Sequence, residues 1–212
     1  MIVKERQIPE KILALEALLR RIAENHEKRP EIQEELRSRR RGYKGEVQFD
    51  YYLSLLPVEN YLILNQLRLP HKSSFFQIDS LLISDKFILI VEIKNFSGKL
   101  HFDHSFRQLT RTMNDIEKGY SYPLSQVQRH YYQLKEWLRN KRLEHIPIEY
   151  FVVQSDPSSI LSNEHNSSIV YQKIIHAAAF LEKLSELENR YKSASADKKT
   201  LKKLVKMLQR DD

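Results

Sequence analysis

Cysteine is absent from this chain of 212 residues. Its absence excludes a disulfide scaffold, a zinc site with cysteine ligands and a thiol nucleophile. No segment approaches the run of about 18 apolar residues that a membrane span needs. The N-terminal segment, MIVKERQIPEK, lacks the apolar stretch and cleavage site of a secretory signal. We therefore expect a cytoplasmic protein without a membrane partner.

Internal repeats and long low-complexity segments are also missing. Hydrophobic residues make up 41% of the chain, which is enough for a core and excludes a wholly disordered protein. The length fits one domain with additions, since domains usually have roughly 100–200 residues.

Acidic residues are fewer than basic ones, which gives a net charge of +7 and a pI near 9.4. A charge of this sign indicates a polyanionic partner. Residues 1–42 carry 11 basic and 8 acidic side chains, residues 43–180 carry 15 and 14, and residues 181–212 carry 9 and 6. The middle of the chain is therefore nearly neutral, and both flanks are basic.

The N-terminal flank has the spacing of an amphipathic helix. Its apolar seam consists of Ile8, Ile12, Leu15, Leu19 and Ile22. Such a seam packs on the same domain or pairs with another helix. In the second case the chain would form a homo-oligomer through this helix.

A second helix is predicted to begin near Pro30, because proline suits the first helical turn. We expect this helix to end in the basic run at residues 37–41 and a break to follow at residues 42–45. A third helix then covers residues 46–56 and stops at Pro57.

Alternation and short apolar runs predict the strands of the middle region. We expect strands at residues 61–69, 75–83, 87–94, 99–102, 107–112, 150–153 and 169–171, and helices at 123–140, 174–191 and 198–210. This order predicts an α/β fold with a mixed central β-sheet flanked by helices. We divide it into an N-terminal helical extension (1–41), a core (42–175) and a C-terminal helical extension (176–212).

Charged residues interrupt the strand predicted at 87–94. Glu92 and Lys94 are two residues apart and share a face of that strand, and Asp79 interrupts the preceding strand. A hairpin that turns symmetrically about residues 85–86 places Asp79 opposite Glu92. Burying an unpaired charge costs several kcal/mol. Either Lys94 therefore forms an internal salt bridge with these acids, or a hard cation such as Mg²⁺ lies between the carboxylates.

An ordered set of motifs surrounds these residues: Gly45-Glu46, Gln77-Ile78-Asp79, Val91-Glu92-Ile93-Lys94-Asn95 and Pro123-Leu124-Ser125-Gln126, with His130 one turn later. In order and spacing the set resembles the nuclease-related domain family, NERD, whose fold is the PD-(D/E)XK, restriction-endonuclease-like core. The resemblance runs from about residue 42 to at least residue 137. There are two departures. Tyr122 replaces a usual asparagine, and Phe106 stands in for a frequent tryptophan.

The resemblance implies a metal-dependent nuclease with DNA as the expected substrate. Asp79 and Glu92 would ligate Mg²⁺ or Mn²⁺, and Lys94 would orient or activate the attacking water and help hold the phosphate. Glu46 and Gln126 would reach the same site from the flanking helices. A metal ion with a nearby ammonium suits phosphodiester hydrolysis. DNA repair, recombination and processing are all compatible roles.

Basic residues beside Glu46 are candidates for contact with nucleic acid. They are Arg39, Arg40, Arg41 and Lys44, and His130 joins them because it shares a helix face with Gln126. The alternative for the basic residues is a solvated charge run, and for His130 a polar contact on the helix surface. The lysines at 198–206 lie on a helix that could dock on the domain, bind nucleic acid or contact a partner.

Three functions thus compete for the whole chain. The first is a metal-dependent nuclease. The second is a non-catalytic module that keeps the fold and binds nucleic acid. The third is a protein-assembly role led by the helical flanks.

Overall fold

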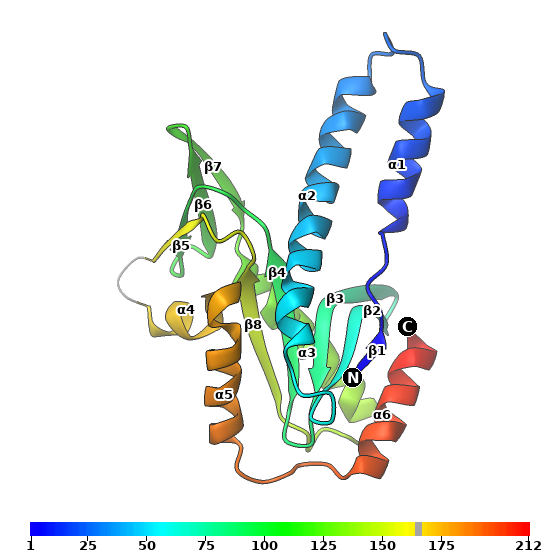
Figure 1. Ribbon diagram of the computed structural model, residues 1–212, viewed down its shortest axis with the longest axis vertical. Coiled ribbons are helices and arrows are strands. Elements are labelled where there is room, and N and C mark those ends of the chain that lie inside the picture. Colours follow the sequence, from blue (N-terminus) through cyan, green and yellow to red (C-terminus); the bar gives the residue numbers. More distant parts are fainter. Residues whose placement is uncertain (164–166) are drawn as a thin grey trace.

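The computed structural model of the chain describes residues 1–163 and 167–212. It has the mixed α/β architecture that the sequence predicts, with helices at both ends of the chain. Figure 1 shows a central sheet with helices on both faces, and a helical hairpin and a smaller sheet that project beyond one end. No helix in the described ranges is long and apolar enough to cross a membrane.

The main sheet is mixed and has six strands in the order β1-β2-β3-β4-β8-β10. Their bounds are β1 Ile2–Lys4, β2 Leu62–His71, β3 Ser74–Ile83, β4 Ile88–Lys94, β8 Ile148–Gln154 and β10 Ile174–His176. Strands β2, β3 and β4 are antiparallel neighbours, whereas β1, β8 and β10 pair in parallel. Strand β4 is apolar on both faces because it is covered from both sides.

Each face of the main sheet is covered by helices. Helices α3 (Pro123–Asn140) and α6 (Lys198–Asp211) share a hydrophobic cluster on one face. Helices α2 (Arg29–Ser54) and α5 (Phe180–Arg190) contribute to the cluster on the other face. These two layers of helices bury the sheet, and the carboxyl end of the central strand β4 lies at one end of it.

The N-terminal seam packs within the chain. Helix α1 (Glu10–Arg21) lies along α2, and Ile12 and Leu15 form a small cluster with Leu36 of α2. The seam thus takes the first of its two expected arrangements. Homo-oligomerisation through this helix stays a prediction.

A second sheet has four strands in the order β7-β6-β5-β9. They are β5 Lys99–Asp103, β6 Gln108–Met113, β7 Ile116–Ser121 and β9 Ile160–Asn163. Strands β5 and β6 match the predictions. Strands β7 and β9 were not predicted, because most residues of β7 are exposed and β9 is short.

The predicted break at residues 42–45 is wrong, since α2 continues through it to Ser54. Gly45 serves a close approach between elements. A Cβ atom there would lie 2.6 Å from Ser155 Oγ and even closer to Asn95 Cβ. The glycine therefore lets an unbroken helix pack against the end of β4. The three-region division of the chain remains a prediction.

The strand predicted at residues 169–171 is also wrong. This segment lies in the short helix α4 (Ser168–Lys173), and β10 follows directly. The helix predicted from residue 174 begins only at Phe180, after the 3-10 turn η2 (Ala177–Ala179). Strand β10 extends the sheet beside β8 and buries Ile174 and Ile175. Its three residues therefore belong to the sheet and not to the expected helix.

Candidate active site

The predicted catalytic residues converge on one cleft of about 580 Å³. Glu46 comes from α2, Asp79 from β3, Glu92 and Lys94 from β4, and Gln126 from the first turn of α3. The cleft opens between α2 and strands β6 and β7, whose side chains also line it. Five residues spread over 81 positions of the sequence thus share a single site.

The β3–β4 register confirms the symmetric hairpin. Ser80 pairs with Val91, and each inner pair follows in step. The ladder stops there, and Asp79 Oδ2 accepts a hydrogen bond from the backbone N–H of Ile93 at 2.8 Å. A side chain therefore replaces the next ladder bond, which holds the Asp79 carboxylate beside β4 at the start of the cleft.

Lys94 forms the internal salt bridge that the sequence left open. Its Nζ lies 2.7 Å from Glu92 Oε1 and donates to Gln126 Oε1 at 3.0 Å. Burial lowers the pKa of Lys94, but the charges of Glu92 and Asp79 outweigh it and raise the pKa above its usual value. Lys94 is therefore a fixed cation at the floor of the cleft.

Glu92 is 2% exposed, and its second carboxylate oxygen faces His130. Burial alone raises the pKa of Glu92, yet His130 and Lys94 outweigh burial and hold it below its usual value. The distance from His130 Nδ1 to Glu92 Oε2 is 3.4 Å, and neither atom has a hydrogen-bond partner in the described chain. Glu92 therefore stays ionised, with Oε1 paired to Lys94 and Oε2 buried against His130.

Asp79 lies in the field of two other acids. Burial raises its pKa well above the usual value, and the nearby carboxylates of Glu92 and Glu46 raise it further, against the opposing effect of Lys94. The three carboxylates carry more negative charge than Lys94 and the nearby Arg6 balance. Such a cluster favours a bound cation.

Arg6 is a site residue that sequence reasoning missed. Its side chain is 3% exposed, and Nη1 donates to Glu46 Oε2 at 2.6 Å and to the backbone oxygen of Asp79 at 3.3 Å. The same guanidinium binds Asp50 and reaches Ser80 Oγ at 2.9 Å. No pattern signals a lone arginine in the segment after β1, so only the fold reveals its role.

Gln66 is a second residue that the sequence did not indicate. It has a positive φ of 51° and interrupts the β2–β3 ladder opposite Asp79. Its Nε2 donates to Glu46 Oε2 at 3.2 Å. Arg6 and Gln66 together hold the Glu46 carboxylate. Burial raises the pKa of Glu46 and Arg6 lowers it, and the net effect is a pKa above the usual value.

The predicted nucleic-acid residues separate into different environments. Arg41 lines the cleft, and Lys44 is exposed on α2. Arg39 pairs with Glu35 and Arg40 with Glu16, so their charges are partly compensated. His130 is buried behind Glu92 and is not on the cleft wall.

The opposite wall carries basic residues that the sequence did not indicate. Arg111 of β6 pairs in register with Lys118 of β7, and both line the cleft. Arg111 is held by the backbone oxygen of Ser97 at 2.7 Å, and Lys118 lies over the ring of Tyr120. They were missed because β7, which carries Lys118, was not predicted, so Arg111 of the predicted strand β6 had no partner strand.

The nuclease-related domain family matches residues 41–155, more than half of the chain. The chain belongs to the NERD family. Comparisons with curated proteins and with solved structures found no match. All five residues predicted as catalytic lie within the NERD region, whereas Arg6 and α6 lie outside it.

The donor set of the NERD cleft fits a divalent ion that prefers oxygen. Among the residues that the structure describes, no group of three His, Cys, Asp or Glu side chains is placed to hold a metal ion. Mg²⁺, however, is usually bound through one or two carboxylates, with water and substrate phosphate as its other ligands. Asp79 and Glu92, which both line the cleft, supply two carboxylates that meet that requirement.

Proposed function

We propose that this NERD protein is a Mg²⁺- or Mn²⁺-dependent nuclease that hydrolyses phosphodiester bonds in DNA. The observation that carries the proposal is the convergence of Glu46, Asp79, Glu92 and Lys94 in one cleft. The cleft also has cationic side chains on two walls, Arg41 on α2 and Arg111 and Lys118 on the β6–β7 hairpin. An acidic floor between basic walls suits a metal ion below and a phosphate backbone above.

Asp79 and Glu92 would hold the divalent ion. A bound ion neutralises charge on the phosphoryl oxygens and lowers the pKa of a coordinated water. Lys94 is cationic at neutral pH, and its ammonium would orient the attacking water and donate to a phosphate oxygen. Gln126 keeps Lys94 in place through its 3.0 Å hydrogen bond. Glu46, fixed by Arg6, would complete the acidic side of the site.

The walls of the cleft would position the substrate. Phosphate contacts fix a nucleic acid without reading its sequence. Arg41 and Lys118 can move to meet phosphates because they have no acidic partner in the described chain, while Arg111 is already held by Ser97. We therefore expect binding that depends on salt and is largely independent of sequence.

A cleavage assay tests the proposal. The purified protein is incubated with supercoiled, linear and single-stranded DNA in Mg²⁺, in Mn²⁺ and in EDTA. We expect cleavage only with the divalent ions. Asp79→Asn and Lys94→Met should each lower the rate at least about 100-fold, the usual scale for losing one electrostatic group of an active site. Failure of the wild-type protein to cut any of these DNAs would refute the proposal.

One observation favours a second candidate, a non-catalytic module that binds nucleic acid. Lys94 already pairs with Glu92, and Arg6 already pairs with Glu46, so part of the acidic charge is balanced without metal. Calorimetric titration with Mn²⁺ separates the two candidates. Saturable binding that Asp79→Asn removes supports the nuclease. DNA binding without metal binding supports the module.

A further inference from the structure

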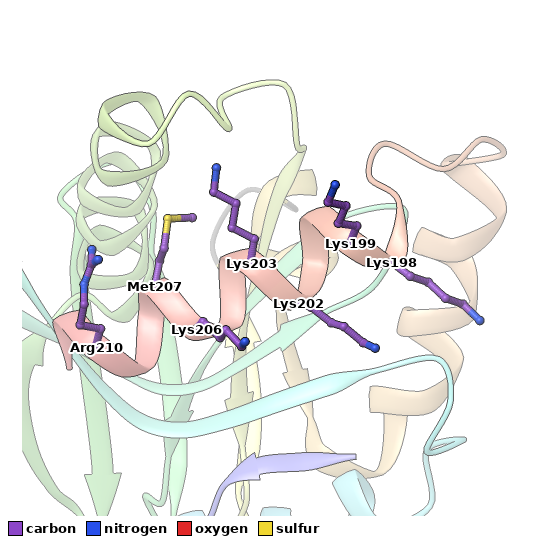
Figure 2. A pocket seen from close by; sticks show the side chains of 7 residues that line it. All are labelled: Lys198, Lys199, Lys202, Lys203, Lys206, Met207 and Arg210. Atoms are coloured by element: carbon purple, nitrogen blue, oxygen red, sulfur yellow. The ribbon is translucent and has the colours of Figure 1, made fainter.

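A basic surface lies on α6, far along the chain from the NERD region. It is formed by Lys198, Lys199, Lys202, Lys203, Lys206 and Arg210, which line an open groove of about 720 Å³ with Met207. Figure 2 shows Lys199 and Lys203 extending from one side of the helix and Lys202 and Lys206 from the other. We call these six residues the α6 basic surface.

The acids near this surface have partners other than its lysines. Asp197 caps the helix by accepting a hydrogen bond from Thr200 N at 2.7 Å. Asp211 pairs with Lys141 at 2.8 Å and also with Arg210 of this surface at 3.1 Å, and Asp212 accepts from Lys4 and from the backbone of Arg68. Within the described ranges, no ion pair involves the five lysines. Their positive charge is therefore available to a ligand.

Helix stability does not explain the charge pattern. The first turn of α6 contains lysines and no acid, although the positive end of the helix dipole lies there. Lys198 and Lys202, and likewise Lys199 and Lys203, are like charges four residues apart, which repel each other. The helix is held instead by its buried apolar side, which consists of Leu201, Leu204, Val205 and Leu208. The lysines therefore destabilise the helix that carries them, as expected for residues that serve binding rather than stability.

We propose that the α6 basic surface binds the phosphate backbone of nucleic acid, as a second contact outside the catalytic cleft. The chemistry of the surface favours this partner over two others. A helix that binds membranes inserts an apolar face, and the apolar face of α6 is already buried in the core. Protein interfaces are poor in lysine and rich in aromatic residues, and this surface has no aromatic residue.

The first turns of α6 and the cleft lie at opposite ends of strand β4. The segment before α6 bonds to the β3–β4 turn, where Ser195 N donates to Asp85 O at 2.7 Å. Strand β4 starts beside that turn and reaches the cleft only at its other end, at Glu92 and Lys94. A nucleic acid on the first turns of α6 therefore contacts the protein independently of the scissile phosphate.

The test compares two double variants that lose equal charge. Lys199→Gln with Lys203→Gln changes the α6 basic surface, and Lys183→Gln with Lys192→Gln changes α5 and the segment after it, on the other face of the sheet. Binding to a short fluorescent DNA duplex is measured by anisotropy in EDTA, over a range of salt concentrations. Melting temperatures confirm that both variants fold.

We expect the α6 variant to bind DNA about tenfold more weakly than the wild type. The salt dependence of its binding constant should correspond to about two fewer released counterions, while the control variant matches the wild type. Equal affinity and equal salt slope for the wild type and the α6 variant would overturn the proposal. The proposal would also be overturned if the α6 substitutions weakened binding to vesicles that contain phosphatidylglycerol and left binding to DNA unchanged. The proposal shares its ligand class with the proposed nuclease but needs no cleavage. A protein that binds as expected and cuts nothing would therefore refute only the nuclease.

Discussion

At the scale of residues, the site is an arrangement of charges that balance one another. Lys94 faces Glu92 across 2.7 Å, and Arg6 faces Glu46 across 2.6 Å. The sequence offered the first pair as one of two alternatives, because an acid and a lysine two apart in a buried strand must be compensated by each other or by a bound cation. It could not predict the second pair, because Arg6 and Glu46 are 40 residues apart and belong to different elements.

Arg6→Ala is expected to destabilise the protein by about 3 kcal/mol, the lower end of the cost of breaking a buried pair, because it leaves the partly buried carboxylates of Glu46 and Asp50 without their cation. Thermal unfolding measures the loss. The control is Arg37→Ala, whose pair with Glu34 is about two-thirds exposed and which should cost less than about 1 kcal/mol. Equal shifts for the two variants would show that Arg6 is not a structural cation.

The other site residues show which positions a sequence pattern can identify and which it cannot. Asp79, Glu92 and Lys94 could be predicted because they interrupt apolar strands. Glu46 and Gln126 were assigned through family motifs alone. Arg111 and Lys118 could not be placed together, because Lys118 lies on the exposed strand β7, where no sequence pattern marks a strand, and Arg111 pairs with it.

At the scale of elements, α2 connects the projecting hairpin with the candidate cleft. It continues for 26 residues and carries Leu36 against α1, Gly45 against β4 and Phe49 in the core. The sequence favoured a break because glycine is a poor helix former. Packing decides otherwise, since only the absence of a side chain at Gly45 admits the end of β4.

The two glycines of α2 give a matched pair of variants. Gly45→Ala should cost about 1–3 kcal/mol through overpacking against Asn95 and Ser155. Gly42→Ala has nothing within 4 Å of its new Cβ and should stabilise the helix by up to about 1 kcal/mol. Chemical denaturation measures both changes. Stabilisation by both substitutions would contradict the close approach at Gly45.

Glu149 ties β8 to the elements that follow it. Its carboxylate pairs with Lys173 at 2.6 Å and with Arg190 at 3.3 Å, and accepts from Tyr191 Oη at 2.7 Å. Burial raises its pKa, but these partners outweigh burial and lower the pKa below the usual value. The stability that Glu149 contributes is therefore present above its unfolded pKa of about 4.3 and is lost as the pH falls through the lower folded value.

Glu149→Gln should lower the melting temperature at neutral pH, and the difference from the wild type should shrink as the pH falls below about 4. Melting curves between neutral and acidic pH check this directly. A difference that stays constant over that range would mean that the ionised carboxylate contributes nothing.

Most elements of the fold could be predicted from the sequence. Strands β2 to β6, helix α3 and strand β8 follow from alternation, apolar runs and proline positions. The errors concentrate where an element is short or exposed. Strand β10 has three residues and reads as part of a helix until β8 is placed beside it.

At the scale of the whole molecule, the charge is divided between two surfaces. Residues 43–180 are close to neutral, with 15 basic and 14 acidic side chains, whereas α6 alone carries six basic residues and one acidic residue. The cleft and the α6 basic surface share no residue. Energetic effects at separate surfaces usually add.

Arg41→Gln with Lys118→Gln should weaken DNA binding, and combining this pair with Lys199→Gln and Lys203→Gln should give the sum of the two losses in binding free energy. Anisotropy titrations of the two double variants and the quadruple variant test this. A quadruple variant no weaker than either double variant would show that both pairs belong to one surface.

The most direct measurement for the central claim is the anomalous scattering of a crystal soaked in Mn²⁺. We expect a single peak in the cleft, contacted by the carboxylates of Asp79 and Glu92, which disappears in Asp79→Asn. An empty cleft at saturating Mn²⁺, or a peak that leaves these two carboxylates untouched, would contradict the claim.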